Sequence, residues 1–150
     1  MANVFRNKGE YDKALEWYQR ALDGSEKVLG RGQPDTLTTV HNMANVFFEN
    51  QGDNDKALKW YQRALDGRER ALGKDHHLTL TTVDNMALVF WNKGEYDKAM
   101  EWNQRSLDGL GKALGIDHPE TLNAANNMAG ALWEKGEYDK SLERYQRCWL

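Results

Sequence analysis

The sequence predicts an all-α protein: a solenoid of antiparallel helix hairpins, with about eight helices of which the first and last are truncated. An internal repeat is the first observation, because a short motif that opens with Met-Ala recurs at Met1, Met43, Met86 and Met128. These spacings of 42, 43 and 42 residues are typical of stacked repeat units. Apolar residues at helical spacing inside each repeat, interrupted by a glycine-containing turn, are the second observation.

The repeat divides the chain into four units, which we expect to form a single array over residues 1–150. Each unit holds a first helix, a turn and a second helix, and stacking of the units buries the apolar faces that one unit leaves open. The expected units are residues 1–33, 34–76, 77–118 and 119–150.

The first helix of a unit is clearest in the second copy. Leu37, Val40, Met43 and Phe47 follow one another at spacings of three or four residues, so they share one helix face. This copy also carries one extra residue near Gln51, since its turn glycine lies nine residues after the Met rather than eight. The insertion predicts either a wider turn, which we favour, or a π-bulge in the first helix.

The second helices carry residue types that recur with the repeat. A periodic tryptophan is typical of packing rather than of binding, and we assign this role to Trp17, Trp60 and Trp102. A glycine inside a helix costs roughly 1 kcal/mol relative to alanine, so a close helix approach or a local bend is expected where it recurs. The recurring glycines are Gly24, Gly67 and Gly109.

Composition excludes several classes of function. The net charge of -3, with basic and acidic residues interleaved, provides no basic stripe for nucleic acid. No apolar run approaches the roughly 20 residues that span a bilayer, so we expect no membrane partner. The single Cys148 excludes an internal disulfide and favours a cytoplasmic location. We find no catalytic motif and expect no enzyme activity, cofactor or metal; the adjacent His76 and His77 lack a third ligand at useful spacing.

A family resemblance follows from the turn and second-helix residues. The pattern Gly-x-Tyr-x-x-Ala, which ends at Ala14 and is followed by Tyr18 and Ala21, resembles the tetratricopeptide repeat. The 42-residue period and the linker at residues 114–122 resemble the kinesin light chain type. The sequence of residues 16–22 is similar to that of C-terminal repeat arrays of NACHT or NB-ARC receptor-like proteins in microbial eukaryotes. The resemblance implies a right-handed superhelix whose first helices line a concave groove.

Positions at which the four copies differ define a candidate ligand-binding groove. Offsets of two before, two after and five after the Met lie four and three residues apart, and therefore form one stripe on the first helix. We add the asparagine before the Met and the residue six after it. The candidate residues are Asn3, Arg6, Asn7, His41, Asn42, Asn45, Phe48, Glu49, Asp84, Asn85, Leu88, Trp91, Asn92, Asn126, Asn127, Trp133 and Glu134.

Two readings of these residues stay open. The aromatic members Phe48, Trp91 and Trp133 are either anchors for a ligand or packing residues against neighbouring helices. The asparagines either bond the main chain of an extended ligand or tie adjacent helices together. The positions that hold the cations of a carboxylate clamp in the family are not basic here. The stripe itself offers only Arg6 and His41 against Asp84, Glu49 and Glu134, so a neutral or mildly basic peptide fits better than an acidic one.

The expected function is that of a scaffold that binds a peptide or a partner surface in the groove, as part of a larger signalling or adaptor protein. The alternative is a structural spacer or self-association segment of a longer array, with no ligand of its own. Neither end of the sequence looks like a polar cap, since the first copy lacks the residues before its Met and the last stops inside a second helix. Apolar ends of this kind predict an end-to-end homo-oligomer.

Overall fold

The structure contains six helices within the residues that it describes. It is a computed structural model of the chain and describes residues 9–50 and 53–136. Six is fewer than the eight helices expected, because the expected first and last helices fall at residues 1–8 and 137–150, outside the described residues. By its internal contacts the chain divides into two compact units, residues 1–72 and 73–150.

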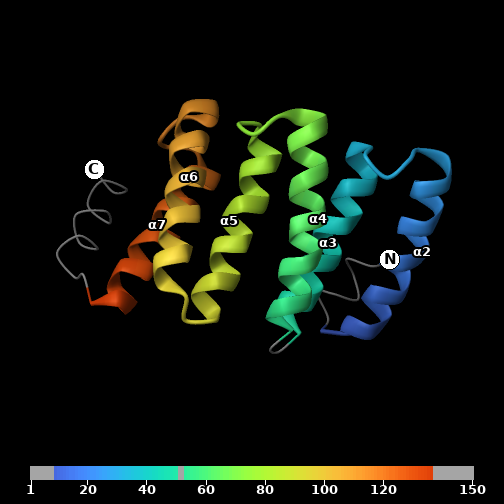
Figure 1. The fold of residues 1–150 in the computed structure, drawn as a ribbon, viewed down its shortest axis with the longest axis horizontal. Helices are drawn as coiled ribbons and strands as arrows, with labels where there is room; N and C mark the ends of the chain where they lie inside the picture. Colours follow the sequence, from blue (N-terminus) through green and yellow to red (C-terminus); the bar gives the residue numbers. More distant parts are fainter. Residues whose placement is uncertain (1–8, 51–52, 137–150) are drawn as a thin grey trace. The chain divides into compact units, whose positions relative to one another are not determined.

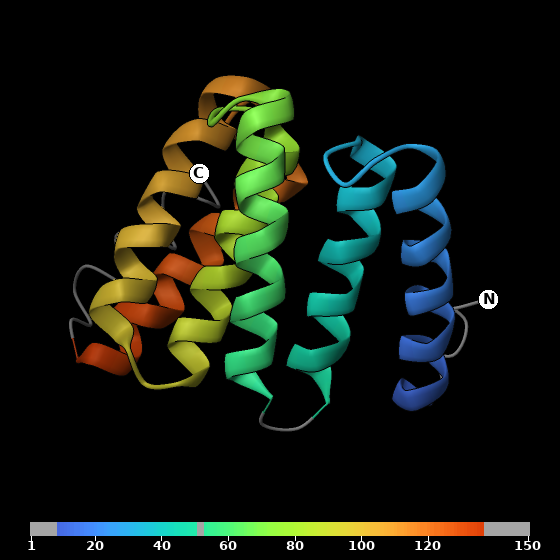
Figure 2. The ribbon, with the colours of Figure 1, turned by 45° about the vertical axis from the view of Figure 1, so that its right-hand side comes forward.

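The first unit holds three helices, α2 (Tyr11–Val28), α3 (Pro34–Glu49) and α4 (Asn54–Leu72). They run in alternating directions, and α3 packs against both of its neighbours (Figures 1 and 2). The core between them is made of tyrosine and aliphatic side chains that are almost fully buried. Its members are Ala14, Tyr18, Leu22, Val40, Met43, Val46 and Ala64.

The second unit holds α5 (His77–Asn92), α6 (Tyr96–Leu114) and α7 (Pro119–Lys135). Helix α6 packs against both α5 and α7, and α5 also contacts α7 directly. Leu80 and Leu110 lie at the centre of the core between α5 and α6. Both α5 and α7 are first helices in the repeat, and both carry candidate residues.

Helix starts explain the histidines that precede α5 and α7. The Nδ1 atom of His76 accepts a hydrogen bond from the backbone N–H of Leu78 at 3.1 Å, and His118 caps α7 in the same way through Glu120 at 3.2 Å. Each imidazole therefore satisfies one of the backbone donors that a helix start leaves without a partner. His76 also stacks on His77, with ring centroids 4.5 Å apart.

The extra residue of the second copy lies in the turn. Helices α3 and α5 both have 16 residues, and α4 and α6 both have 19. The link inside the first hairpin covers residues 50–53, whereas the link inside the second covers only residues 93–95. Helix α3 is α-helical throughout, so the π-bulge interpretation is wrong and the insertion widens the link. Residues 51–52 of that link are outside the described part of the chain.

Two of the recurring glycines allow close helix approach. A Cβ atom added at Gly67 would lie 2.3 Å from Cδ2 of Leu37, and one added at Gly109 would lie 2.4 Å from Cδ1 of Leu80. These distances are far below van der Waals contact, so only glycine lets the leucine of the first helix pack at this point. A Cβ at Gly24, the remaining member of the series, would meet nothing within 4 Å.

The structure confirms that the tryptophans Trp60 and Trp102 pack inside their hairpins. The ring of Trp60 stacks on Phe47 with centroids 6.2 Å apart, and Trp102 meets Phe90 at 5.7 Å. These contacts lock each second helix onto the end of its first helix. The guanidinium of Arg20 makes a cation–π contact with the Trp17 ring, with Cζ 4.7 Å from the ring centroid.

Candidate functional site

The candidate residues in the described part of the chain lie on α3 in the first unit and on α5 and α7 in the second. Three members of the predicted set lie outside the described residues: Asn3, Arg6 and Asn7. The candidate residues form one face on α3 in the first unit and another face on α5 and α7 in the second unit.

On α3, exposure increases from the middle of the helix toward its end. His41 is buried, with 7% of its surface exposed, whereas Asn42, Asn45 and Phe48 are partly exposed and Glu49 is exposed. The part of this face that a ligand can reach is accordingly formed by the second half of the helix.

A chain of polar contacts lies beneath this face and joins α3 to α4. The Tyr61 hydroxyl donates to Oδ1 of Asn45, and the Tyr61 ring packs edge-on against His41 at 5.4 Å. On its other side, Nδ1 of His41 lies 3.3 Å from Nη1 of Arg68, which is only 4% exposed. Burial lowers the pKa of the Arg68 guanidinium. The imidazole of His41 is therefore one of the polar groups that solvate the buried Arg68 cation.

On the second unit, α5 and α7 are tied together by candidate residues. The Asn127 side-chain amide donates to Oδ2 of Asp84 at 3.1 Å. About one turn further along α7, the Trp91 ring lies over Gly130, where a Cβ atom would meet Cη2 of the ring at 3.4 Å. For Asn127 this is the helix-tying role that the sequence left open, and the absent side chain of Gly130 makes room for Trp91.

Asp84 occupies an unfavourable place for a charge. Its carboxyl is 8% exposed, and Oδ1 has no hydrogen-bond partner among the described residues. Burial raises the pKa of Asp84, the hydrogen bond from Asn127 opposes the rise and nearby Glu120 adds to it, and the resulting pKa is about 7. At neutral pH the carboxyl is thus partly protonated, and it contributes less negative charge to this face than the sequence implies.

The exposed part of the second unit's candidate face is on α7 and at the end of α5. Trp133 exposes 51% of its surface, which is unusual for the largest apolar side chain. Leu88 and Asn85 are partly exposed, and the other exposed candidates are Asn92, Asn126 and Glu134. The accessible groups of this face are therefore one large aromatic ring, amide side chains and a carboxylate.

Arg68 and Tyr61 shape the first unit's face, although sequence reasoning did not select them. A signal for Arg68 was present, because Leu110 occupies the corresponding position 42 residues later. A cation at a repeat position that holds a buried leucine in the next copy indicates a local polar network.

The fold defines a class of protein, the helical-hairpin repeat proteins. The part of the chain that is described holds no group of three metal-ligating side chains. The sequence matches the tetratricopeptide repeat family over residues 1–50, 40–112 and 82–148. The chain therefore belongs to the tetratricopeptide repeat family.

Solved structures of similar fold include a putative kinesin light chain from Podosopora anserina with nearly identical TPR-like repeats. That protein and a single-residue variant of it each align with a TM-score of 0.85 and 20% identity, over 98% of this chain and 69% of theirs. BtubC (BKLC) from P. vanneervenii aligns with a TM-score of 0.88 and 20% identity, over 98% of this chain and 58% of its own. At this identity the likeness shows the fold, and it agrees with the kinesin light chain type of repeat.

No curated protein matches the sequence. Within the described residues, every helix is too short or too polar to cross a membrane.

Proposed function

We propose that the chain is a non-catalytic protein-interaction module of a larger signalling or adaptor protein, and that the exposed faces of its first helices bind a peptide or the surface of a partner. The exposure of Trp133 carries this proposal, because half of its surface is accessible and tryptophan is enriched at interface hot spots. Tetratricopeptide repeats generally act through protein contacts, which supports the same function.

The ligand that best fits these faces is neutral or mildly basic. Glu49 and Glu134 are exposed on them, and Lys and Arg do not occur among the described candidate residues. A basic or neutral segment is attracted or tolerated by such a surface, whereas an acidic one is repelled. Exposed Asn126 offers a donor and an acceptor to the main chain of an extended segment.

The experiment is a peptide-display selection against the purified chain and its Trp133→Ala variant. Because Trp133 is half exposed, we expect the variant to lose the enriched motif while its melting temperature changes little. Ile116→Ala is a matched control, since Ile116 is a 72% exposed apolar residue in the turn before α7, and we expect it to retain the motif.

Enrichment that survives Trp133→Ala would contradict the assignment of this face. Absence of enrichment on every variant would favour the alternative, a structural or self-associating segment. Sedimentation at tens of micromolar then distinguishes the two forms of that alternative, because only self-association gives a species larger than the monomer.

A further inference from the structure

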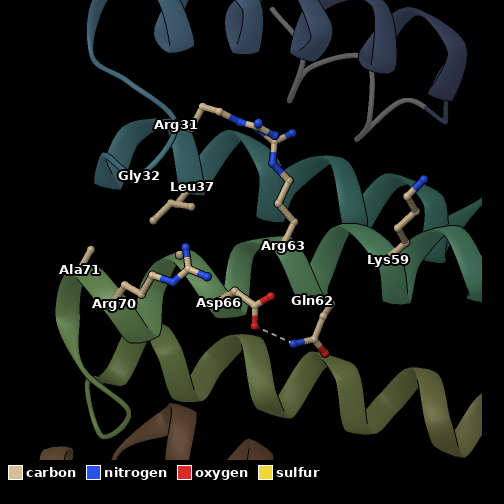
Figure 3. Close-up of a pocket in the computed structure, with 10 residues that line it drawn as sticks. Arg31, Gly32, Leu37, Lys59, Gln62, Arg63, Asp66, Arg70 and Ala71 are labelled. Atoms are coloured by element: carbon tan, nitrogen blue, oxygen red, sulfur yellow. Dashed lines mark hydrogen bonds between the residues drawn. The ribbon is translucent and has the colours of Figure 1, made fainter.

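A second surface lies on the first unit, away from the candidate residues. A pocket of about 750 Å³ opens between α4 and the loop that joins α2 to α3 (Figure 3). Its lining shares no residue with the candidate faces of the first helices. A ligand of this pocket would therefore be independent of the ligand proposed for the first helices.

The centre of the pocket is apolar and is shaped by a glycine. Leu37, Gly67 and Ala71 contribute to its lining. The Leu37 side chain packs directly against the backbone of Gly67, where a Cβ atom would not fit. Helix α4 therefore projects no side chain into the pocket at residue 67. The close helix approach that the repeat requires thus also leaves a hollow on the surface.

Basic side chains surround this centre. Four of the ten lining residues are cationic and only one is anionic: the cations are Arg31, Lys59, Arg63 and Arg70, against Asp66. The Asp66 carboxylate accepts a hydrogen bond from the Gln62 amide at 2.9 Å and keeps its charge, so the lining holds four positive charges against one negative charge. An excess of positive charge therefore faces the hollow, although the whole chain has a net charge of -3.

One carboxylate organises part of this charge. Glu26 on α2 binds Nη2 of Arg63 and lies 3.8 Å from Nε of Arg31, which brings the two guanidinium groups together (Figure 3). Lys59 and Arg70 pair with no carboxylate in the described part of the chain. The pocket accordingly combines two positioned guanidinium groups with two cations that are available to a ligand.

The excess charge is larger in this hairpin than in the next. At the corresponding positions of the next copy, Lys74, Arg105 and Lys112 keep three of the four cations, while Glu101 replaces Lys59. Lys59 therefore distinguishes this pocket from the next copy, whereas the other basic positions recur with the repeat.

The spread of the cations indicates the size of the ligand. Lys59 and Arg70 are separated by three turns of α4, roughly 16 Å along the helix axis. A single phosphate or carboxylate reaches one or two of these groups, whereas about five residues of extended chain cover the distance. None of the ten lining residues is aromatic, so the pocket offers no ring on which a nucleic acid base could stack.

We propose that this pocket is a second binding site that takes an acidic segment of a partner protein, about five residues long, with carboxylates on the four cations and its aliphatic parts against the apolar centre. Each exposed ion pair contributes little alone, so the affinity comes from several pairs together and falls as salt is added.

Calorimetric titration of the chain with hexaglutamate tests this site, with hexaglutamine as the neutral comparison. At about 50 mM salt we expect saturable binding of hexaglutamate only. The double variant Arg31→Glu/Arg70→Glu should weaken it by about tenfold or more, and Lys59→Glu, which installs the residue type of Glu101, by about threefold or more. Lys74→Glu/Lys112→Glu makes the same change in net charge outside the pocket and should alter it by less than about twofold.

Circular dichroism of each variant establishes that the helices are intact before the titrations are compared. Equal weakening by the two double variants would overturn the proposal, because it would show attraction to the net charge rather than to the pocket. Failure of hexaglutamate to saturate at about 50 mM salt, equal binding of hexaglutamine, or tighter binding of a deoxythymidine oligonucleotide of similar charge would overturn it as well.

Discussion

At the scale of single residues, Asp84 is the group whose burial has the clearest consequence. Because its pKa is raised to about 7, the folded protein keeps a proton that the unfolded chain releases between about pH 4 and pH 7. The Asp84 carboxyl therefore lowers the free energy of unfolding as pH rises through this range. We expect Asp84→Asn to remove this loss and to stabilise the protein by about 1–3 kcal/mol at pH 8, with less effect at pH 5, as measured by urea unfolding.

The next repeat supports this choice of substitution, since Asn126 stands at the position that corresponds to Asp84. An amide oxygen at residue 84 can still accept the hydrogen bond from Asn127. Asp108→Asn is the control, because it removes an exposed carboxylate and should change stability by less than about 0.5 kcal/mol. A variant at residue 84 that is less stable than the parent at pH 8 would show that the carboxyl is better solvated than the structure indicates.

At the scale of helices, the two kinds of glycine in α6 make opposite predictions. Gly109→Ala places a Cβ 2.4 Å from the buried Leu80, so we expect a loss of about 1–3 kcal/mol in spite of the better helix propensity of alanine. Gly111→Ala, in the same helix, meets nothing within 4 Å and should stabilise by up to about 1 kcal/mol. Thermal unfolding of both variants measures the difference, and stabilisation by Gly109→Ala would contradict the close-approach explanation.

Much of this architecture could be predicted from the sequence, because helix periodicity, the Pro and Gly positions and the repeat are local signals. The packing roles of Trp60 and Trp102 followed from recurrence alone. Exposure within the candidate stripe did not, since His41 and Asp84 are covered by side chains from other helices. Comparison of repeats identifies which positions vary, but a position that varies is not thereby exposed. Arg68 stands where the next copy has Leu110, and it is a buried partner for His41.

At the scale of the whole chain, the two proposed sites should act independently. Trp133, the most exposed aromatic residue of the candidate faces, lies in the second unit. The pocket beside α4 is formed entirely by residues of the first unit. The sites share no residue and favour ligands of different charge. Two sites influence each other only when one ligand changes the affinity for the other, and the effect must be reciprocal.

We therefore expect saturating hexaglutamate to change the dissociation constant of an uncharged display-selected peptide by less than about twofold, as measured by fluorescence anisotropy, because neither ligand removes a contact of the other. Substitutions in the two sites should likewise have additive effects, with Lys59→Glu affecting only the acidic peptide and Trp133→Ala only the selected one. Displacement of one peptide by the other would show that both use a single surface. A reciprocal change well above twofold without displacement would instead show that binding at one unit alters the conformation of the other.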